Sequence, residues 1–199
     1  SEGFTEYVIS DSADFNPTVY AVDVDGDGDM DVLSSSVSDD KIAWYENDGS
    51  EGFTEHAITT SADGARDVHA ADMDGDGDMD VLSAINYRDG IAWYENDGNE
   101  SFTEHEISTN TNCGSPICWG WAKDLYAADV DGDGDMDVLS TSSNYDYIAW
   151  YENDGSENFT EYVISDSAEN ASSVRAADVD GDGDMDVLST SSGDIKIAW

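Results

Sequence analysis

The chain has 199 residues, with 47 Asp and Glu side chains against 6 Lys and Arg, and a formal net charge of −41. This charge excludes nucleic acid as a partner, because nucleic-acid binding needs basic patches, and it opposes contact with an anionic membrane. Hydrophobic residues make up 39% and aromatic residues 11% of the chain, enough for a folded core. No run is long and apolar enough to span a membrane, and no signal peptide is visible.

The first predicted elements form one unit of short strands. The opening segment "FTEYVIS", from Phe4, precedes predicted strands at 19–24, 30–34, 41–46 and 53–58. Apolar and polar residues alternate in these strands, and turn residues such as Asn-Asp-Gly separate them. No window shows the 3.6-residue period of a helix, so we expect an all-β protein.

The unit occurs four times along the chain. Its acidic loop "DVDGDGDMDVL" or "DMDGDGDMDVL" begins at Asp23, Asp72, Asp129 and Asp178, and an insertion at 108–124 lengthens the second interval. Four antiparallel strands per repeat predict the blades of a β-propeller, which we expect to form one domain over residues 1–199. Alanine recurs at one position of the predicted innermost strand, where a tight ring of blades requires a small side chain. These residues are Ala21, Ala70, Ala127 and Ala176.

The two chain ends hold complementary parts of a blade. The chain opens on a fourth strand and stops on a third strand at Trp199. Pairing of 4–9 with 195–199 would complete the C-terminal blade, close a four-blade ring and hide the sheet edges. Three alternatives stay open: the blades belong to a longer array, two chains form one ring, or the opening strand completes a neighbouring chain's blade by strand donation.

The spacing of carboxylates in the acidic loops predicts calcium binding. Counted from Asp23, carboxylates lie at positions 1, 3, 5 and 9 and a glycine at position 6, while position 7 is expected to offer its backbone carbonyl. Calcium takes six to eight oxygens at about 2.3–2.6 Å, and glycine permits the sharp turn; magnesium prefers its own waters. An EF-hand is excluded, since position 12 is Ser34 and the flanks are strands.

We therefore expect about four calcium ions, one in each repeat. The predicted metal-binding residues are Asp23, Asp25, Asp27, Asp29 and Asp31; Asp72, Asp74, Asp76, Asp78 and Asp80; Asp129, Asp131, Asp133, Asp135 and Asp137; and Asp178, Asp180, Asp182, Asp184 and Asp186.

With "DVDGDGDMDVL" and "IAWYENDG", the repeats resemble the FG-GAP/VCBS family, the calcium-loop blades of integrin α-subunit propellers and of many extracellular proteins. The resemblance covers essentially the whole chain. It implies that the calcium loops join first and second strands on one face, with ligands meeting the opposite face or the grooves between blades. The "FG" and "GAP" signatures themselves are degenerate in this chain.

No catalytic constellation is visible in the sequence. His56 and His105 occupy a repeat position that is Tyr7 and Tyr162 elsewhere, which indicates packing variation, and His69 stands alone. There is no G-x-S-x-G motif and no phosphate loop. Because carboxylates are abundant throughout the chain, no single pair of them stands out as the acid pair of a glycoside hydrolase. We expect a protein that is not an enzyme.

The insertion is the exception to the repeat and the candidate ligand surface. Cys113 and Cys118 predict a small disulfide-closed loop, with two free thiols as the alternative; zinc lacks a second ligand pair. Exposed aromatic side chains can stack on sugar rings or anchor a protein partner. The alternative is that Trp119 and Trp121 of the insertion pack as a small core at one end of the propeller. The candidate platform is Trp119, Trp121, Tyr87, Tyr145 and Tyr147.

Three N-x-S/T sequons, at Asn99, Asn158 and Asn170, are candidate glycosylation sites on loops. Together these patterns predict an extracellular, secreted calcium-binding propeller that binds a carbohydrate or protein ligand without catalysis. The alternative function is a structural protomer of an extracellular fibre or homo-oligomeric assembly, joined by strand donation.

Overall fold

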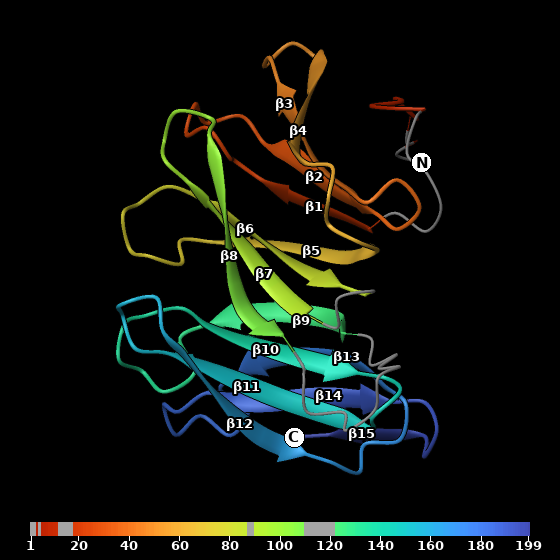
Figure 1. Ribbon diagram of the computed structural model, residues 1–199, viewed down its shortest axis with the longest axis vertical. Helices are drawn as coiled ribbons and strands as arrows, with labels where there is room; N and C mark the ends of the chain where they lie inside the picture. The colour runs from red at the N-terminus through yellow and green to blue at the C-terminus, as the bar shows by residue number, and fades with distance from the viewer. Residues whose placement is uncertain (1–2, 4, 12–17, 87–89, 110–121) are drawn as a thin grey trace.

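The computed structural model describes residues 3, 5–11, 18–86, 90–109 and 122–199, and the strands named below lie within these ranges (Figure 1). Fifteen strands form four antiparallel sheets, which confirms the all-β class. In these residues no helix has the length and hydropathy that a membrane crossing requires.

Each sheet corresponds to one repeat, with its strands in chain order. The first sheet contains β1 (Thr18–Val22), β2 (Asp31–Ser36), β3 (Lys41–Asn47) and β4 (Phe53–Thr59). The second contains β5 (Ala65–Ala71), β6 (Asp80–Ile85), β7 (Gly90–Asn96) and β8 (Phe102–Thr109). The third contains β9 (Ala122–Ala128), β10 (Asp137–Ser142), β11 (Tyr147–Asn153) and β12 (Phe159–Ser165), and the fourth contains β13 (Ala171–Ala177), β14 (Asp186–Ser191) and β15 (Lys196–Ala198).

The same register recurs in every sheet and places the tryptophan of the third strand. Trp44 lies opposite Leu33 on β2 and opposite His56 on β4. Its ring stacks on the His56 ring with centroids 4.6 Å apart, and Trp150 stacks on Tyr162 at 4.9 Å in the third sheet. Such cross-strand aromatic pairs stabilise a sheet, so histidine and tyrosine at this position serve packing.

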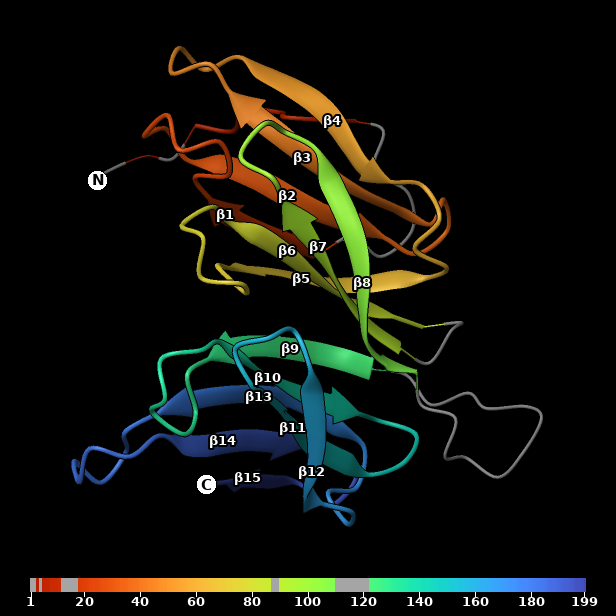
Figure 2. The same ribbon diagram turned by 60° about the vertical axis from the view of Figure 1, so that its left-hand side comes forward.

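The hydrophobic core lies between neighbouring sheets. The first strands lie next to one another, β1 by β5, β5 by β9 and β9 by β13 (Figure 2). The first cluster combines Leu33 and Ile42 of the first sheet with Val68 and Val81 of the second. Both faces of β3 are covered, since Ala43 is 0% and Trp44 1% exposed. Each sheet is therefore stabilised mainly by the next one.

Buried asparagines join successive sheets by hydrogen bonds. The Nδ2 atom of Asn96 donates to the carbonyl of Met79 in its own sheet and to that of Val24 in the first sheet. Asn153, 1% exposed, does the same with Met136 and with Met73 of the second sheet.

The sheets form an open array. In the described residues the fourth sheet has three strands, and β15 is exposed at its edge. The segment 5–11 lies at the opposite end, against the first sheet, where Val8 and Ile9 line a groove with Val19 and Val32 (Figure 1). The expected pairing of this segment with 195–199 is therefore not formed within the molecule, because side-by-side stacking of the sheets carries the two ends apart.

Replacing Asn153 by Ala should lower the free energy of unfolding by about 1–3 kcal/mol, because the buried carbonyl of Met73 and the partly buried carbonyl of Met136 lose a hydrogen-bond donor. Asn47→Ala is the matched control, since Asn47 donates only to Met30 of its own sheet and should cost less. Denaturant unfolding of both variants measures the difference. Equal losses would show that the bond between sheets does not stabilise the array.

Candidate metal centres and the row of inner-strand side chains

The four acidic loops lie on one side of the array. Each joins the first strand of its sheet to the second, and all four project from the left of Figure 2. The strands end there because alternating Asp and Gly residues cannot continue a ladder. The ladder resumes at the "DVL" segment, whose Val and Leu follow the position-9 aspartate in β2, β6, β10 and β14.

Aspartate side chains wind each loop by accepting backbone hydrogen bonds. In the first loop, the carboxylate of Asp23 accepts from the N–H groups of Gly26 and Gly28 at 2.9 and 3.1 Å. Asp25 accepts from Asp27 N–H at 3.1 Å. Gly26 and Gly28 have φ of 74° and 97°, a region that side chains disfavour. The glycine at position 4 is thus as necessary to the turn as the predicted one at position 6.

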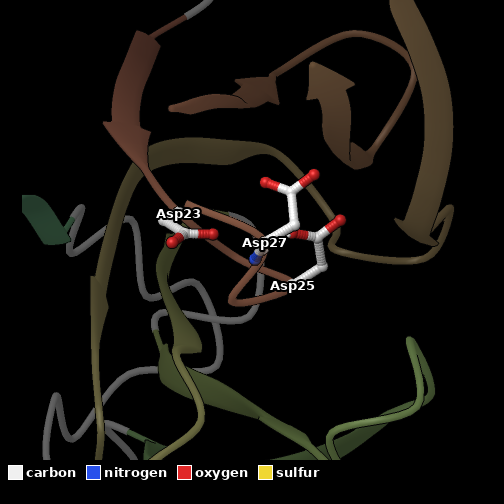
Figure 3. Close-up of side chains that lie close together, drawn as sticks. All are labelled: Asp23, Asp25 and Asp27. Carbon is white, nitrogen blue, oxygen red and sulfur yellow. Dashed lines mark hydrogen bonds between the residues drawn. The ribbon is translucent and has the colours of Figure 1, made fainter. Parts of the chain in front are cut away.

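The turns bring three carboxylates of each loop together. In the first loop these are Asp23, Asp25 and Asp27, whose side chains are shown in Figure 3. In the other loops they belong to positions 1, 3 and 9: Asp72, Asp74 and Asp80; Asp129, Asp131 and Asp137; and Asp178, Asp180 and Asp186. One oxygen from each residue lies within 4.8 Å of the others, whereas oxygens around one calcium ion are up to about 5 Å apart.

Two further observations suit a hard cation. The Oδ1 atom of Asp72 is shielded from solvent and has no hydrogen-bond donor in the described structure. Burial and neighbouring carboxylates raise the pKa of Asp25 and of Asp74, against backbone hydrogen bonds that lower it. A bound cation would satisfy the lone oxygen and relieve the repulsion. The residues present therefore fit calcium.

The carboxylate at position 9 has a structural role that sequence reasoning missed. Asp31 is 0% exposed and accepts from Val24 N–H of its loop at 2.9 Å and from Asn47 N–H of β3 at 2.8 Å. Asp80, Asp137 and Asp186 accept the equivalent loop bond. Burial raises the pKa of Asp80 to about 7. This residue ties the loop to the sheet, with lone pairs remaining for a cation.

The carboxylate at position 7 points out of the loop toward the next hairpin. A Cβ added to Gly49, in the turn between β3 and β4, would lie 2.4 Å from the Asp29 carboxylate. Gly98 and Asp78, and Gly155 and Asp135, are related in the same way. The glycine of each "NDG" turn thus leaves room for this side chain, which is not among the grouped oxygens.

The structure describes only some of the other predicted site residues. Cys113, Cys118, Tyr87, Trp119 and Trp121 lie outside the described residues. Tyr145, 38% exposed, and Tyr147 lie at the turn between β10 and β11, and the Tyr147 hydroxyl donates to Glu161 at 2.7 Å. The sequon asparagines Asn99, Asn158 and Asn170 are all exposed.

A row of side chains along the first strands was missed. Tyr20, His69, Tyr126 and Arg175 occupy one repeat position, one in each sheet. Ring centroids are 4.5 Å apart between Tyr20 and His69 and 5.3 Å between His69 and Tyr126, and the Arg175 guanidinium lies 5.3 Å from the Tyr126 centroid. The signal was variation at one position of otherwise near-identical repeats.

Carboxylates beside this row join successive first strands. Asp67 accepts from Leu125 N–H at 2.8 Å, and Asp124 accepts from Val174 N–H and from Arg175 at 2.8 and 2.7 Å. Burial raises the pKa of Asp67 to about 6. Burial, helped by Arg175, lowers the pKa of His69 to about 4, so the imidazole is neutral at pH 7. The row is partly buried, aromatic and polar at once.

Comparison with known sequences assigns the chain to a family. The sequence model of the FG-GAP-like repeat matches residues 23–83, 80–140 and 129–189. The chain therefore belongs to the FG-GAP repeat family. None of the curated proteins compared with the chain matches it.

Two solved structures share the fold. A lectin from Agrocybe aegerita, described as recognising non-reducing terminal N-acetylglucosamine, has a TM-score of 0.60 at 17% identity over 87% of this chain and 47% of the lectin chain. The biofilm matrix protein Bap1 of V. cholerae has a TM-score of 0.54 at 23% identity over 86% of this chain and 23% of that chain. This chain thus spans less than half of either.

The Asp67→Asn variant should be more stable than the parent above about pH 6, by about 1–3 kcal/mol, and more sensitive to acid. Because the pKa of Asp67 is raised in the folded protein, protonation of this side chain favours the folded state. The stability it contributes is complete below about pH 4 and is lost as pH rises through about 6. Because the pKa of His69 is lowered in the folded protein, the neutral imidazole favours the folded state. The stability it contributes is complete above about pH 6.5 and is lost as pH falls through about 4. The two contributions offset each other in the parent.

Urea unfolding between about pH 4 and pH 7 measures this effect, and comparing variants cancels the titration of the acidic loops. His69→Gln is the matched control, which should reduce the loss of stability in acid. Parallel pH curves for all three proteins would contradict the assignment.

Proposed function

We propose that this chain is a calcium-binding β-propeller module that binds a ligand outside the cell without catalysis. One observation carries the proposal: three carboxylate oxygens lie within 4.8 Å of one another in each of four loops of identical spacing. Oxygen-only sites in a flexible loop suit calcium over the softer transition metals.

Calcium would be held by the carboxylates at positions 1, 3 and 5 or 9 of each loop. Bound there, it supplies positive charge to a chain of net charge −41. The loop residues themselves do the rest: glycines permit the turn, and the buried position-9 carboxylate fixes the loop to the third strand. The module is thus a scaffold whose order depends on cations.

The structural relatives support a binding role. One is described as recognising a terminal N-acetylglucosamine and the other as a biofilm matrix protein. Aromatic side chains stack on sugar rings, and this chain offers them at Tyr145 and along the inner row at Tyr20 and Tyr126. The proposed ligand is a carbohydrate, or a glycosylated protein.

Chelation should unfold or loosen the protein at low salt. Each occupied site adds about 2.7 kcal/mol at a hundredfold excess of calcium over Kd, so four sites contribute on the order of 10 kcal/mol. Added salt should restore part of this stability by screening, whereas acid alone should not, because protonated carboxylates lose the metal. Thermal melting with calcium, with chelator, and with chelator plus salt measures it.

Two variants of the second loop separate metal binding from charge. Asp74→Asn removes a grouped carboxylate and should weaken the calcium dependence of melting, whereas Asp78→Asn removes the same charge outside the group and should preserve it. A melting temperature indifferent to chelator, or equal behaviour of the two variants, would reject the loops as calcium sites.

Binding to beads bearing terminal N-acetylglucosamine tests the ligand proposal. If the insertion forms the platform, Trp119→Ala with Trp121→Ala should abolish calcium-dependent binding with little change in melting temperature. A fall of several kcal/mol in stability would assign both tryptophans to a core. Met30→Ala, an exposed position within the first acidic loop, is the control.

A further inference from the structure

The first strands of the four sheets differ in charge from the rest of the chain. Together β1, β5, β9 and β13 hold three of its 6 basic residues but only two of its 47 acidic residues. The basic residues are Arg66, Lys123 and Arg175, and the acidic residues are Asp67 and Asp124. In a protein that repels anions almost everywhere, these strands form the surface that comes closest to attracting them.

A β-bulge near the start of β5 and of β9 places a basic residue at its extra position. In β5 the register shifts between Ala65 and Asp67, which makes Arg66 the extra residue. In β9 the register shifts at the same repeat position, and the extra residue is Lys123. Bulges redirect a side chain at the edge of a sheet. Lys123 forms no ion pair with any residue that the structure describes, so its charge is available to a ligand.

The two carboxylates of these strands are already engaged by donors of the protein. Asp67 accepts from Leu125 N–H at 2.8 Å. Asp124 accepts from Val174 N–H at 2.8 Å and from the Nη1 atom of Arg175 at 2.7 Å. Hydrogen bonds to a carboxylate compensate its charge, so these two groups oppose an incoming anion less than solvated aspartates would.

Arg175 presents most of its guanidinium to solvent. Its side chain is 51% exposed. Among the described residues its hydrogen bonds, to Asp124 and to the carbonyl of Val174, all start from Nη1. The N–H groups of Nη2 and Nε therefore remain for a planar anionic group that accepts two hydrogen bonds at once. Asp124 and the Tyr126 ring, whose centroid lies 5.3 Å away, hold the guanidinium in place.

Three half-buried rings continue from this guanidinium across the array. Tyr126 is followed by His69 at 5.3 Å and by Tyr20 a further 4.5 Å away, measured between ring centroids. Each ring comes from a different sheet, because the first strands lie next to one another (Figure 2). Aromatic faces stack on sugar rings. A strip of rings that ends in a cation thus suits a chain of sugars that carries an acidic group.

We propose that the inner row, which is Tyr20, His69, Tyr126 and Arg175, binds together with Lys123 a carbohydrate chain that bears carboxylates or sulfates. This inference rests on the proposed ligand-binding function and specifies its ligand and its site. The acidic group of the ligand binds the guanidinium of Arg175 and the ammonium of Lys123, on the neighbouring strands β13 and β9. The sugar rings stack along Tyr126 and Tyr20.

The charge of the whole protein makes this recognition local. A chain of net charge −41 repels an acidic glycan at long range, so affinity must come from the direct contacts of the two basic side chains. A neutral glycan would gain the stacking alone. The acidic loops follow the ends of the first strands, whereas Lys123 stands near the start of β9, so the proposed site and the metal centres can be altered separately.

Fluorescence anisotropy of end-labelled hexasaccharides tests the preference, with the 199-residue chain, calcium and about 0.15 M salt. The probes are a hyaluronan hexasaccharide, its carboxyl-reduced form and a sulfated chondroitin hexasaccharide. We expect at least one acidic probe to bind at least about tenfold more tightly than the reduced probe, because only an acidic probe forms charge-assisted hydrogen bonds. The acidic probe that is preferred identifies the group that is recognised.

Substitutions locate the site. Lys123→Gln and Arg175→Gln should each weaken binding of the preferred acidic probe at least about tenfold and leave binding of the reduced probe nearly unchanged. Tyr126→Ala should weaken binding of both. Lys196→Gln removes the same charge from β15 and is the matched control, which should change neither. Melting temperatures report the fold, and Lys123→Gln keeps the test valid if loss of the Arg175–Asp124 pair destabilises the protein.

Three results would overturn the inference. Equal affinity for the acidic and reduced probes would reject it while carbohydrate binding stands. Binding of no probe would reject it and, if beads bearing N-acetylglucosamine are not bound either, would reject carbohydrate binding as well. Tight binding of an acidic probe that survives both Lys123→Gln and Arg175→Gln would place the ligand away from the inner row.

Discussion

The buried carboxylate that ends each acidic loop is the interaction on which the rest of the structure depends. Asp31 accepts one hydrogen bond from the loop and one from the third strand, and Asp80 and Asp137 repeat this arrangement. One side chain thereby fixes the loop, the second strand and the third strand together. A buried charge is costly unless it is paired and hydrogen-bonded. The two N–H donors and, as proposed, a cation meet that condition.

The net charge of −41 opposes folding of this chain in the absence of counter-ions. With 47 acidic against 6 basic residues, ion pairs within the chain neutralise little of the repulsion. The apolar clusters between the sheets hold the array against it, and counter-ions must supply the balance. Because the acidic loops lie on one side, the repulsion is concentrated there, while the aromatic Tyr145 lies at a turn on the other.

Strands and loops could be predicted from the sequence because each depends on local chemistry. Alternation in "KIAWYEN" defines β3, and the Asp-Gly spacing defines the turn that groups Asp23, Asp25 and Asp27. The row from Tyr20 to Arg175 could not be predicted, since it exists only once the first strands stack. The predicted pairing of the opening segment with 195–199 is not formed between the described residues, because local sequence patterns do not determine how successive sheets stack.

Near-identical repeats create the last constraint. Because successive sheets use one kind of interface, each inner sheet buries one half of it against the preceding sheet and the complementary half against the next sheet. Val68 and Ile148 are buried in this way, at 3% and 2% exposure, whereas their counterparts Val19 and Ile197 on the two outer sheets are 71% and 86% exposed. Natural proteins protect such edges or pair them. The segment 5–11 does this in part at the first sheet, where Val8 and Ile9 line a groove with Val19 and Val32.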